Sequence, residues 1–208
     1  TGVQTCALPI LACAVFPNHP RAKHWRDSFM EYFSEFMDTY QRKDDPERNA
    51  VGGRWTENIA CYSGTALIAL LHERRSLMQY DGTDLFADPR IHAWIRWYRD
   101  AMTSPHGGER YVPPEGAHAT SFEPGDPHGQ RQAMFDVARQ LEDSAPDLSR
   151  QMRWIETNGR EGARPPLASV LIRDHGPVMR HDFGGPNEAY LHLLQTDGEL
   201  NYRWPPSA

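Results

Sequence analysis

Gly52-Gly53-Arg54-Trp55-Thr56-Glu57-Asn58-Ile59-Ala60-Cys61-Tyr62 is the stretch that decides the fold of this 208-residue chain. It brings a guanidinium, an indole, a carboxylate, an amide and a phenol together at the start of an expected helix, a mixture typical of a polar cleft rather than of a core. After Thr56, apolar residues recur every three or four positions and no Pro interrupts the run to Leu77, so the pattern predicts a helix. Its apolar stripe consists of Ile59, Ala66, Leu67, Leu70 and Leu71.

Asn58 and Tyr62 are four residues apart on this predicted helix. Side chains at that spacing share one helix face, with about 5–6 Å between Cβ atoms, so the amide and the phenol can address one substrate together. An equally good interpretation is that Asn58 caps the helix and Tyr62 is a half-buried packing residue.

The composition excludes several classes of protein. With 22 basic and 28 acidic residues and a net charge of −6, we expect no nucleic-acid partner and no anionic membrane surface. No apolar run reaches about 18 residues, so we expect no membrane insertion. Three Cys give neither a disulfide framework nor a zinc knuckle, and no His-Glu-x-x-His or Gly-x-Ser-x-Gly motif occurs, so we expect no metal and no cofactor.

Outward from this stretch, the sequence predicts paired helices followed by strands. An aromatic-rich amphipathic helix is expected over residues 20–42, and its stripe is interpreted as packing against other helices in preference to stacking on sugars. Pro89 is expected to begin a third helix that runs to about Met102, and residues 104–129 form a long loop. Further helices are expected over residues 130–142 and 146–157, and strands over 167–172, 176–180 and 189–194.

The two ends of the chain suggest a fragment. Residues 1–10 look like the decapeptide that translated sequencing-adapter DNA produces, and the last residues follow directly on an expected strand. We therefore expect residues 1–10 to be an artefact, residues 11–158 to form a helical domain, and residues 159–208 to be a linker and the beginning of a β domain, within a longer protein.

Three motifs together resemble a known family. They are Gly53-Arg54-Trp55-Thr56-Glu57-Asn58, then Pro113-Pro114-Glu115-Gly116-Ala117-His118 with Gly125-Asp126, and then Asp174-His175-Gly176-Pro177-Val178-Met179-Arg180. In combination they resemble the heparinase II/III-type and alginate-lyase-type polysaccharide lyases. The resemblance implies a mainly α fold, an incomplete (α/α) toroid followed by the start of an antiparallel β-sandwich domain, with an acidic polysaccharide as partner in the cleft between them. It also implies a periplasmic or secreted location.

The resemblance implies β-elimination on a uronic-acid-containing glycan. This reaction removes the C5 proton, and the carbanion forms only if the neighbouring carboxylate is neutralised. Asn58 has the neutralising role, assisted by Arg54 or His118, and Tyr62, with His118 as second candidate, is the base or acid. The candidate substrate-binding residues are Arg54, Trp55, Glu57, His128, Tyr202 and Arg203.

Two alternatives remain open. A glycoside hydrolase on a helical toroid needs two carboxylates about 5–9.5 Å apart, which Glu57 with Glu115 or Asp126 would supply. A non-catalytic carbohydrate-binding protein would use Trp55 and Tyr62 as stacking platforms. The sequence does not determine the oligomeric state.

Overall fold

The computed structural model describes residues 2–55, 62–113 and 130–194. About half of the chain is helical, and a small sheet of four strands accompanies the helices. The α-helices are α1 (Gly2–Val15), α2 (Ala22–Tyr40), α3 (Tyr62–Tyr80), α4 (Pro89–Ala101), α5 (Gln130–Arg139) and α6 (Pro146–Glu156), and a 3-10 turn, η1 (Leu85–Ala87), precedes α4. The strands are β1 (Ala50–Val51), β2 (Val170–Ile172), β3 (Gly176–His181) and β4 (Ala189–His192).

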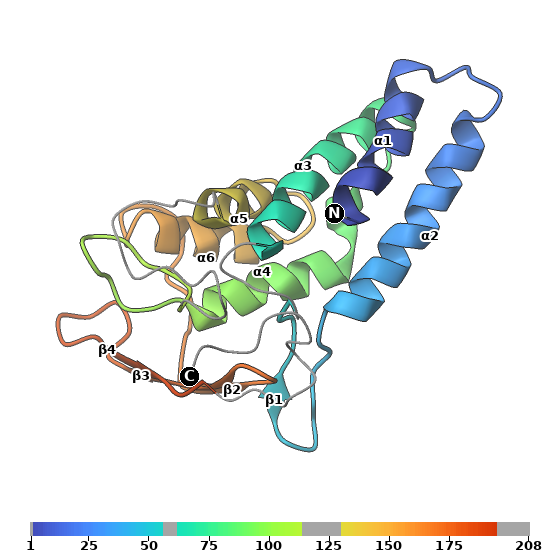
Figure 1. The fold of residues 1–208 in the computed structure, drawn as a ribbon. Helices are drawn as coiled ribbons and strands as arrows, with labels where there is room; N and C mark the ends of the chain where they lie inside the picture. Colours follow the sequence, from blue (N-terminus) through green and yellow to red (C-terminus); the bar gives the residue numbers. More distant parts are fainter. Residues whose placement is uncertain (1, 56–61, 114–129, 195–208) are drawn as a thin grey trace.

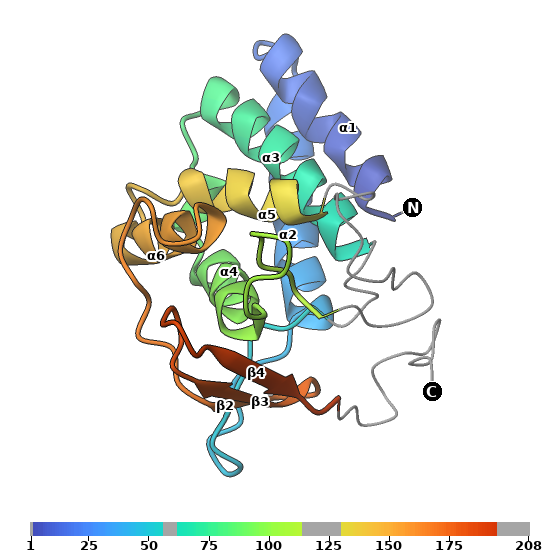
Figure 2. The ribbon, with the colours of Figure 1, turned by 90° about the vertical axis from the view of Figure 1, so that its left-hand side faces the viewer.

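Helix α4 lies between the sheet and helices α3, α5 and α6 (Figures 1 and 2). Helix α1 packs on α2 and α3, helix α3 packs on α5, and α6 contacts both α4 and α5. The core is continuous through these helices and reaches the sheet, because Trp94 and Trp97 of α4 and Val178 of β3 are all fully buried members of it. The mainly α fold expected from the sequence is therefore confirmed, whereas the toroid and the sandwich stay predictions.

Local sequence signals account for the helix boundaries. The Asp88 carboxylate accepts a hydrogen bond of 2.8 Å from Arg90 N and caps α4, and Pro89 occupies its first turn, where a missing N–H costs nothing. In α2, the buried residues are Ala22, Phe29, Phe33, Phe36 and Met37. The aromatic stripe of α2 thus packs inside the molecule, as the sequence predicted.

The sheet has the order β1-β2-β3-β4, with β1 parallel to β2 and the other neighbours antiparallel. Strands β2 to β4 occupy the predicted positions. Strand β1 was not predicted: Ala50 pairs with Leu171, so this strand joins the sheet from the segment that precedes α3. The division of the chain at residue 158 stays a prediction. Strand β1 precedes this residue and strands β2 to β4 follow it, so the sheet contains strands from both predicted parts.

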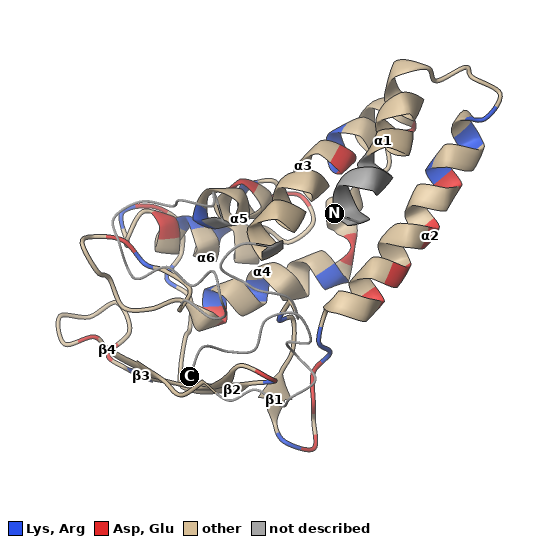
Figure 3. Ribbon diagram, viewed as in Figure 1, with Lys and Arg blue, Asp and Glu red and all other residues tan. Residues whose placement is uncertain are grey.

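Helix α1 covers most of the ten residues that the sequence suggested to be an artefact. Ile10 and Cys13 on this helix are fully buried in the core. None of the described helices is long and apolar enough to cross a membrane. Along α2, the basic residues lie in the first turns and acidic residues follow toward the C-terminal end (Figure 3). Lys23 and Asp27 form an ion pair one turn apart.

Candidate functional site at the junction of helices and sheet

The two glycines that open the deciding stretch permit a very close approach of backbones. A Cβ on Gly52 would lie 2.4 Å from the carbonyl carbon of Lys43, and one on Gly53 would lie 2.2 Å from the carbonyl oxygen of Ala93. Gly53 also has a φ of +93°, which side-chain-bearing residues rarely adopt. The chain after β1 is therefore held directly against α4.

Two residues after Gly53, Trp55 lies in the core. Its ring is fully buried and stacks on Trp94 at 4.4 Å and on Tyr40 at 5.2 Å between ring centroids. Arg54 is also buried, and its Nη1 donates a hydrogen bond of 3.0 Å to the carbonyl oxygen of Trp55. The expectation that Trp55 stacks on a sugar in a polar cleft is wrong, because its buried ring already packs against aromatic side chains. The role of Arg54 in substrate binding stays a prediction.

Most of the other candidate residues lie outside the part of the chain that the structure describes. Tyr62 is the first residue of α3, and only its backbone is described. The candidates outside the described residues are Glu57, Asn58, His118, His128, Tyr202 and Arg203. Their roles, and those of Glu115 and Asp126 in the hydrolase alternative, therefore stay predictions.

Side chains of β3 and β4 cap the C-terminal end of α4. Arg180 Nη2 donates to the carbonyl oxygens of Asp100 (2.7 Å) and Met102 (2.5 Å), and Tyr190 Oη donates to that of Ala101 (3.0 Å). These carbonyls have no partner within the helix, and a cation is stabilised at the negative end of the helix dipole. Burial lowers the pKa of Arg180 to about 10. The sheet is thus fixed to the helices at one defined place.

A buried ion pair makes the second connection. Both terminal nitrogens of Arg110, on the loop after α4, bind the carboxylate of Glu188 at the start of β4, at 2.6 and 2.7 Å. The Arg110 guanidinium lies over the rings of Phe183 and Trp154, at 4.7 and 5.4 Å from their centroids. Burial by itself raises the pKa of Glu188, but the hydrogen bonds from Arg110 and from Gly184 N outweigh it and hold this pKa below its usual value.

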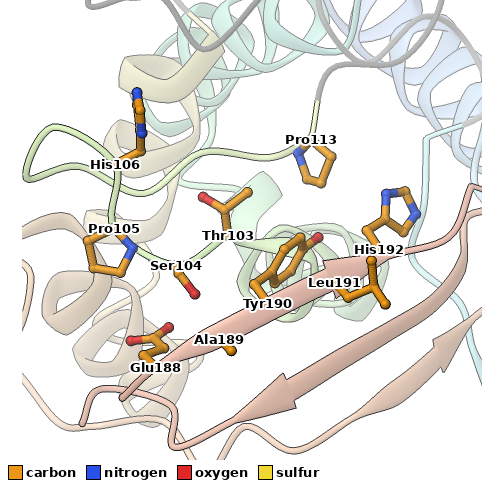
Figure 4. A pocket seen from close by; sticks show the side chains of 10 residues that line it. All are labelled: Thr103, Ser104, Pro105, His106, Pro113, Glu188, Ala189, Tyr190, Leu191 and His192. Carbon is orange, nitrogen blue, oxygen red and sulfur yellow. The ribbon is translucent and has the colours of Figure 1, made fainter. Parts of the chain in front are cut away.

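A cavity of about 610 Å³ opens between the two connections. It lies between the loop that follows α4 and strand β4 (Figure 4), and its lining consists of Thr103, Ser104, Pro105, His106, Pro113, Glu188, Ala189, Tyr190, Leu191 and His192. Thr103 and Ser104 stand on the loop, and the ring of Tyr190 rises from β4 toward them (Figure 4). Pockets of about 300–1,000 Å³ with apolar walls and a few polar groups are typical ligand sites.

One ring nitrogen of His192 has a defined role. Its Nε2 lies 2.7 Å from the carbonyl oxygen of His175, so this nitrogen carries the proton and donates it. The two imidazoles stack with 4.1 Å between centroids, and His175 is fully buried with its ring against the edge of Trp97. In the neutral ring, Nδ1 is consequently an acceptor, and His192 is part of the cavity lining. His175 belongs to the motif at residues 174–180, but the sequence predicted no role for His175 or His192.

Across residues 2–55, 62–113 and 130–194, no group of three or more His, Cys, Asp or Glu is placed to hold a metal ion.

Comparison with known proteins shows a similarity of fold. No family model matches the sequence, and no curated protein matches it in a sequence search. Among solved structures, the chain is similar to a heparinase III (the BT4657 gene product), with a TM-score of 0.61 and 16% sequence identity over 93% of this chain. The chain spans 28% of the length of that protein. At this identity the likeness is one of fold.

Proposed function

We propose that this chain is part of a polysaccharide lyase that cleaves a uronic-acid-containing glycan by β-elimination. The observation that carries the proposal is the similarity of fold to heparinase III along nearly the whole chain. The sequence motifs at residues 53–58 and 113–118, together with Tyr62, give independent support, because they supply the amide, imidazole and phenol that this reaction needs.

In the proposed reaction, the Asn58 amide donates hydrogen bonds to the uronate carboxylate and stabilises the charge that develops when C5 loses its proton. Tyr62 or His118 takes the C5 proton. The electron pair left on C5 forms the C4–C5 double bond, the C4–O bond breaks, and the departing glycosidic oxygen takes a proton from the second of these groups. An unperturbed phenol has a pKa of about 10, so a phenolic base requires a nearby cation such as Arg54.

The test is an elimination assay on the full-length protein. Purified protein is mixed with alginate, heparan sulfate and other uronate polymers, and the ultraviolet absorbance of the unsaturated uronate is followed. A rise supports elimination and names the glycan. Release of reducing ends without absorbance contradicts the proposal and supports the hydrolase with Glu57 as one carboxylate. Binding without either signal would support a carbohydrate-binding protein.

The site assignment has its own test in two variants. Asn58→Ala and Tyr62→Phe are each expected to lower turnover by about 100-fold or more, the usual contribution of a positioned acid, base or oxyanion group. Tyr80→Phe, at the other end of α3, is the matched control and is expected to leave turnover unchanged. Near-normal turnover in both site variants would refute the assignment even if the enzyme is a lyase.

A further inference from the structure

We propose that the cavity between residues 103–106, Pro113 and strand β4 is a binding site for one uncharged sugar unit of the glycan. Identifying the ligand as a sugar rests on the proposed function. The preference for an uncharged unit rests on the cavity itself, through its position, its charge and its hydrogen-bonding groups.

The position of the cavity is fixed by rigid contacts on both sides. On the loop side, Tyr111 N donates to Thr103 Oγ1 at 3.1 Å, and Thr103 N donates to the Tyr111 carbonyl at 2.8 Å. On the strand side, Tyr190 is held by its hydrogen bond to Ala101 at the end of α4. A site whose walls are held in this way binds a ligand without a large ordering cost.

The described part of the lining carries no net charge. Among the described lining residues, Glu188 is the one Lys, Arg, Asp or Glu, and its carboxylate is neutralised by the bidentate pair with Arg110. The other nearby cation, Arg180, is not part of the lining, and its Nη2 is directed to carbonyl oxygens at the end of α4. A uronate carboxylate or a sulfate in this cavity would gain no cation from the described lining, so any hydration that it lost would not be compensated. An uncharged ring has no such penalty.

The polar groups of the lining match hydroxyl and amide groups. Nδ1 of a neutral His192 ring can accept a hydrogen bond, because Nε2 already donates to the carbonyl oxygen of His175. The Ser104 hydroxyl is buried and has no hydrogen-bond partner among the described residues, and a ligand hydroxyl would provide one once this side chain turns toward the cavity. Apolar or aromatic surface comes from Pro105, Tyr190 and Leu191, and Thr103 and His106 add further polar groups. Sugar rings combine apolar faces with hydroxyl edges, so this lining suits them.

The test measures binding to the 208-residue chain by amide chemical shifts. The probes are an uncharged disaccharide, N,N′-diacetylchitobiose, and a di-uronate prepared from alginate. The uncharged probe is expected to shift the amides of residues 103–106 and 189–192 and to bind more tightly than the di-uronate. Ser104→Ala is expected to weaken it about threefold to tenfold, the loss of one hydrogen bond. The same substitution at Ser149, on α6 and outside the cavity, is the control and should change nothing.

A charge variant tests the preference directly. Leu191 lines the cavity and is 52% exposed, whereas Leu193 is 51% exposed and is not part of the lining. Leu191→Lys is expected to strengthen di-uronate binding about twofold to fivefold at low salt, as one exposed ion pair does. Leu193→Lys adds the same charge and should have no comparable effect.

The outcomes separate this inference from the proposed function. Absence of shifts at residues 103–106 and 189–192, or tighter binding of the di-uronate by the unsubstituted chain, would overturn the sugar site even if the full-length protein eliminates uronates. Binding at these residues without elimination by the full-length protein would leave the site intact and refute the lyase.

Discussion

Replacing Arg110 by Met is expected to remove a large part of the stability of this protein. Arg110 and Glu188 are 1% and 7% exposed, and the pair has two direct hydrogen bonds. Without the guanidinium, the Glu188 carboxylate stays buried, and Gly184 N is its remaining hydrogen-bond donor among the described residues. Breaking such a pair costs about 3–5 kcal/mol, a large share of the roughly 5–15 kcal/mol that stabilises a folded protein.

Urea unfolding followed by tryptophan fluorescence measures this loss. For a chain of this size, each kcal/mol lowers Tm by about 2–4 °C, so Arg110→Met should lower Tm by about 6–20 °C. The double variant Arg110→Met with Glu188→Leu removes both charges, so no unpaired charge is buried. Its loss of unfolding free energy is expected to be smaller than the sum of the two single losses by at least about 2 kcal/mol. Arg150→Met, which breaks an exposed pair with Asp147, should leave the midpoint nearly unchanged.

The loss should also depend on pH. Since the pKa of Glu188 is lowered in the folded protein, the pair contributes stability above the ordinary carboxyl pKa of 4.5 and loses it as pH falls through the lowered value. The difference between the parent protein and Arg110→Met is therefore expected to shrink below about pH 4. A loss under about 1 kcal/mol at pH 7, or additive effects in the double variant, would refute the reasoning.

Two further predictions concern single positions. Gly53→Ala combines a φ of +93° with a Cβ 2.2 Å from Ala93 O, so it should cost at least about 2 kcal/mol in urea unfolding. Gly82→Ala also has a positive φ but open space around the Cβ, so it should cost only about 1 kcal/mol, and equal losses would contradict the close-approach argument. Burial raises the pKa of Glu73 to about 7, so its contribution to stability is complete below pH 4.5 and is lost as pH rises through 7. Glu73→Gln should accordingly be more stable than the parent by up to about 3 kcal/mol at pH 8 and equally stable at pH 4, and an equal difference at both pH values would refute this.

The sequence predicted elements whose signals are local. Pro89 marked the start of α4, and the aromatic period of α2 indicated which face is buried. Strand β1 was not predicted, because it has only two residues and its partners Leu171 and Ile172 lie far along the chain. The helix over Gly2–Val15 was not predicted, because Pro9 lies inside it and residues 1–10 were interpreted as an artefact.

The candidate site was harder to predict than the fold. Trp55 was expected to stack on a sugar because its neighbours in sequence are polar, yet Tyr40 and Trp94 enclose it. Aromatic side chains suit a core and a sugar-binding surface equally well, so residue type alone does not decide between them. The roles of Asn58 and Tyr62 stay predictions.

By itself, the sequence determined helices α2 to α6, three of the four described strands and an excess of negative charge, because periodicity, capping residues and composition act over a few residues. Tertiary structure alone decided that Arg110 meets Glu188, 78 residues away, and that β4 faces the loop after α4 across a cavity with no net charge. The physical reason is that burial, desolvation and ion pairing depend on which groups the complete fold brings into contact, and no short stretch of the chain contains that information.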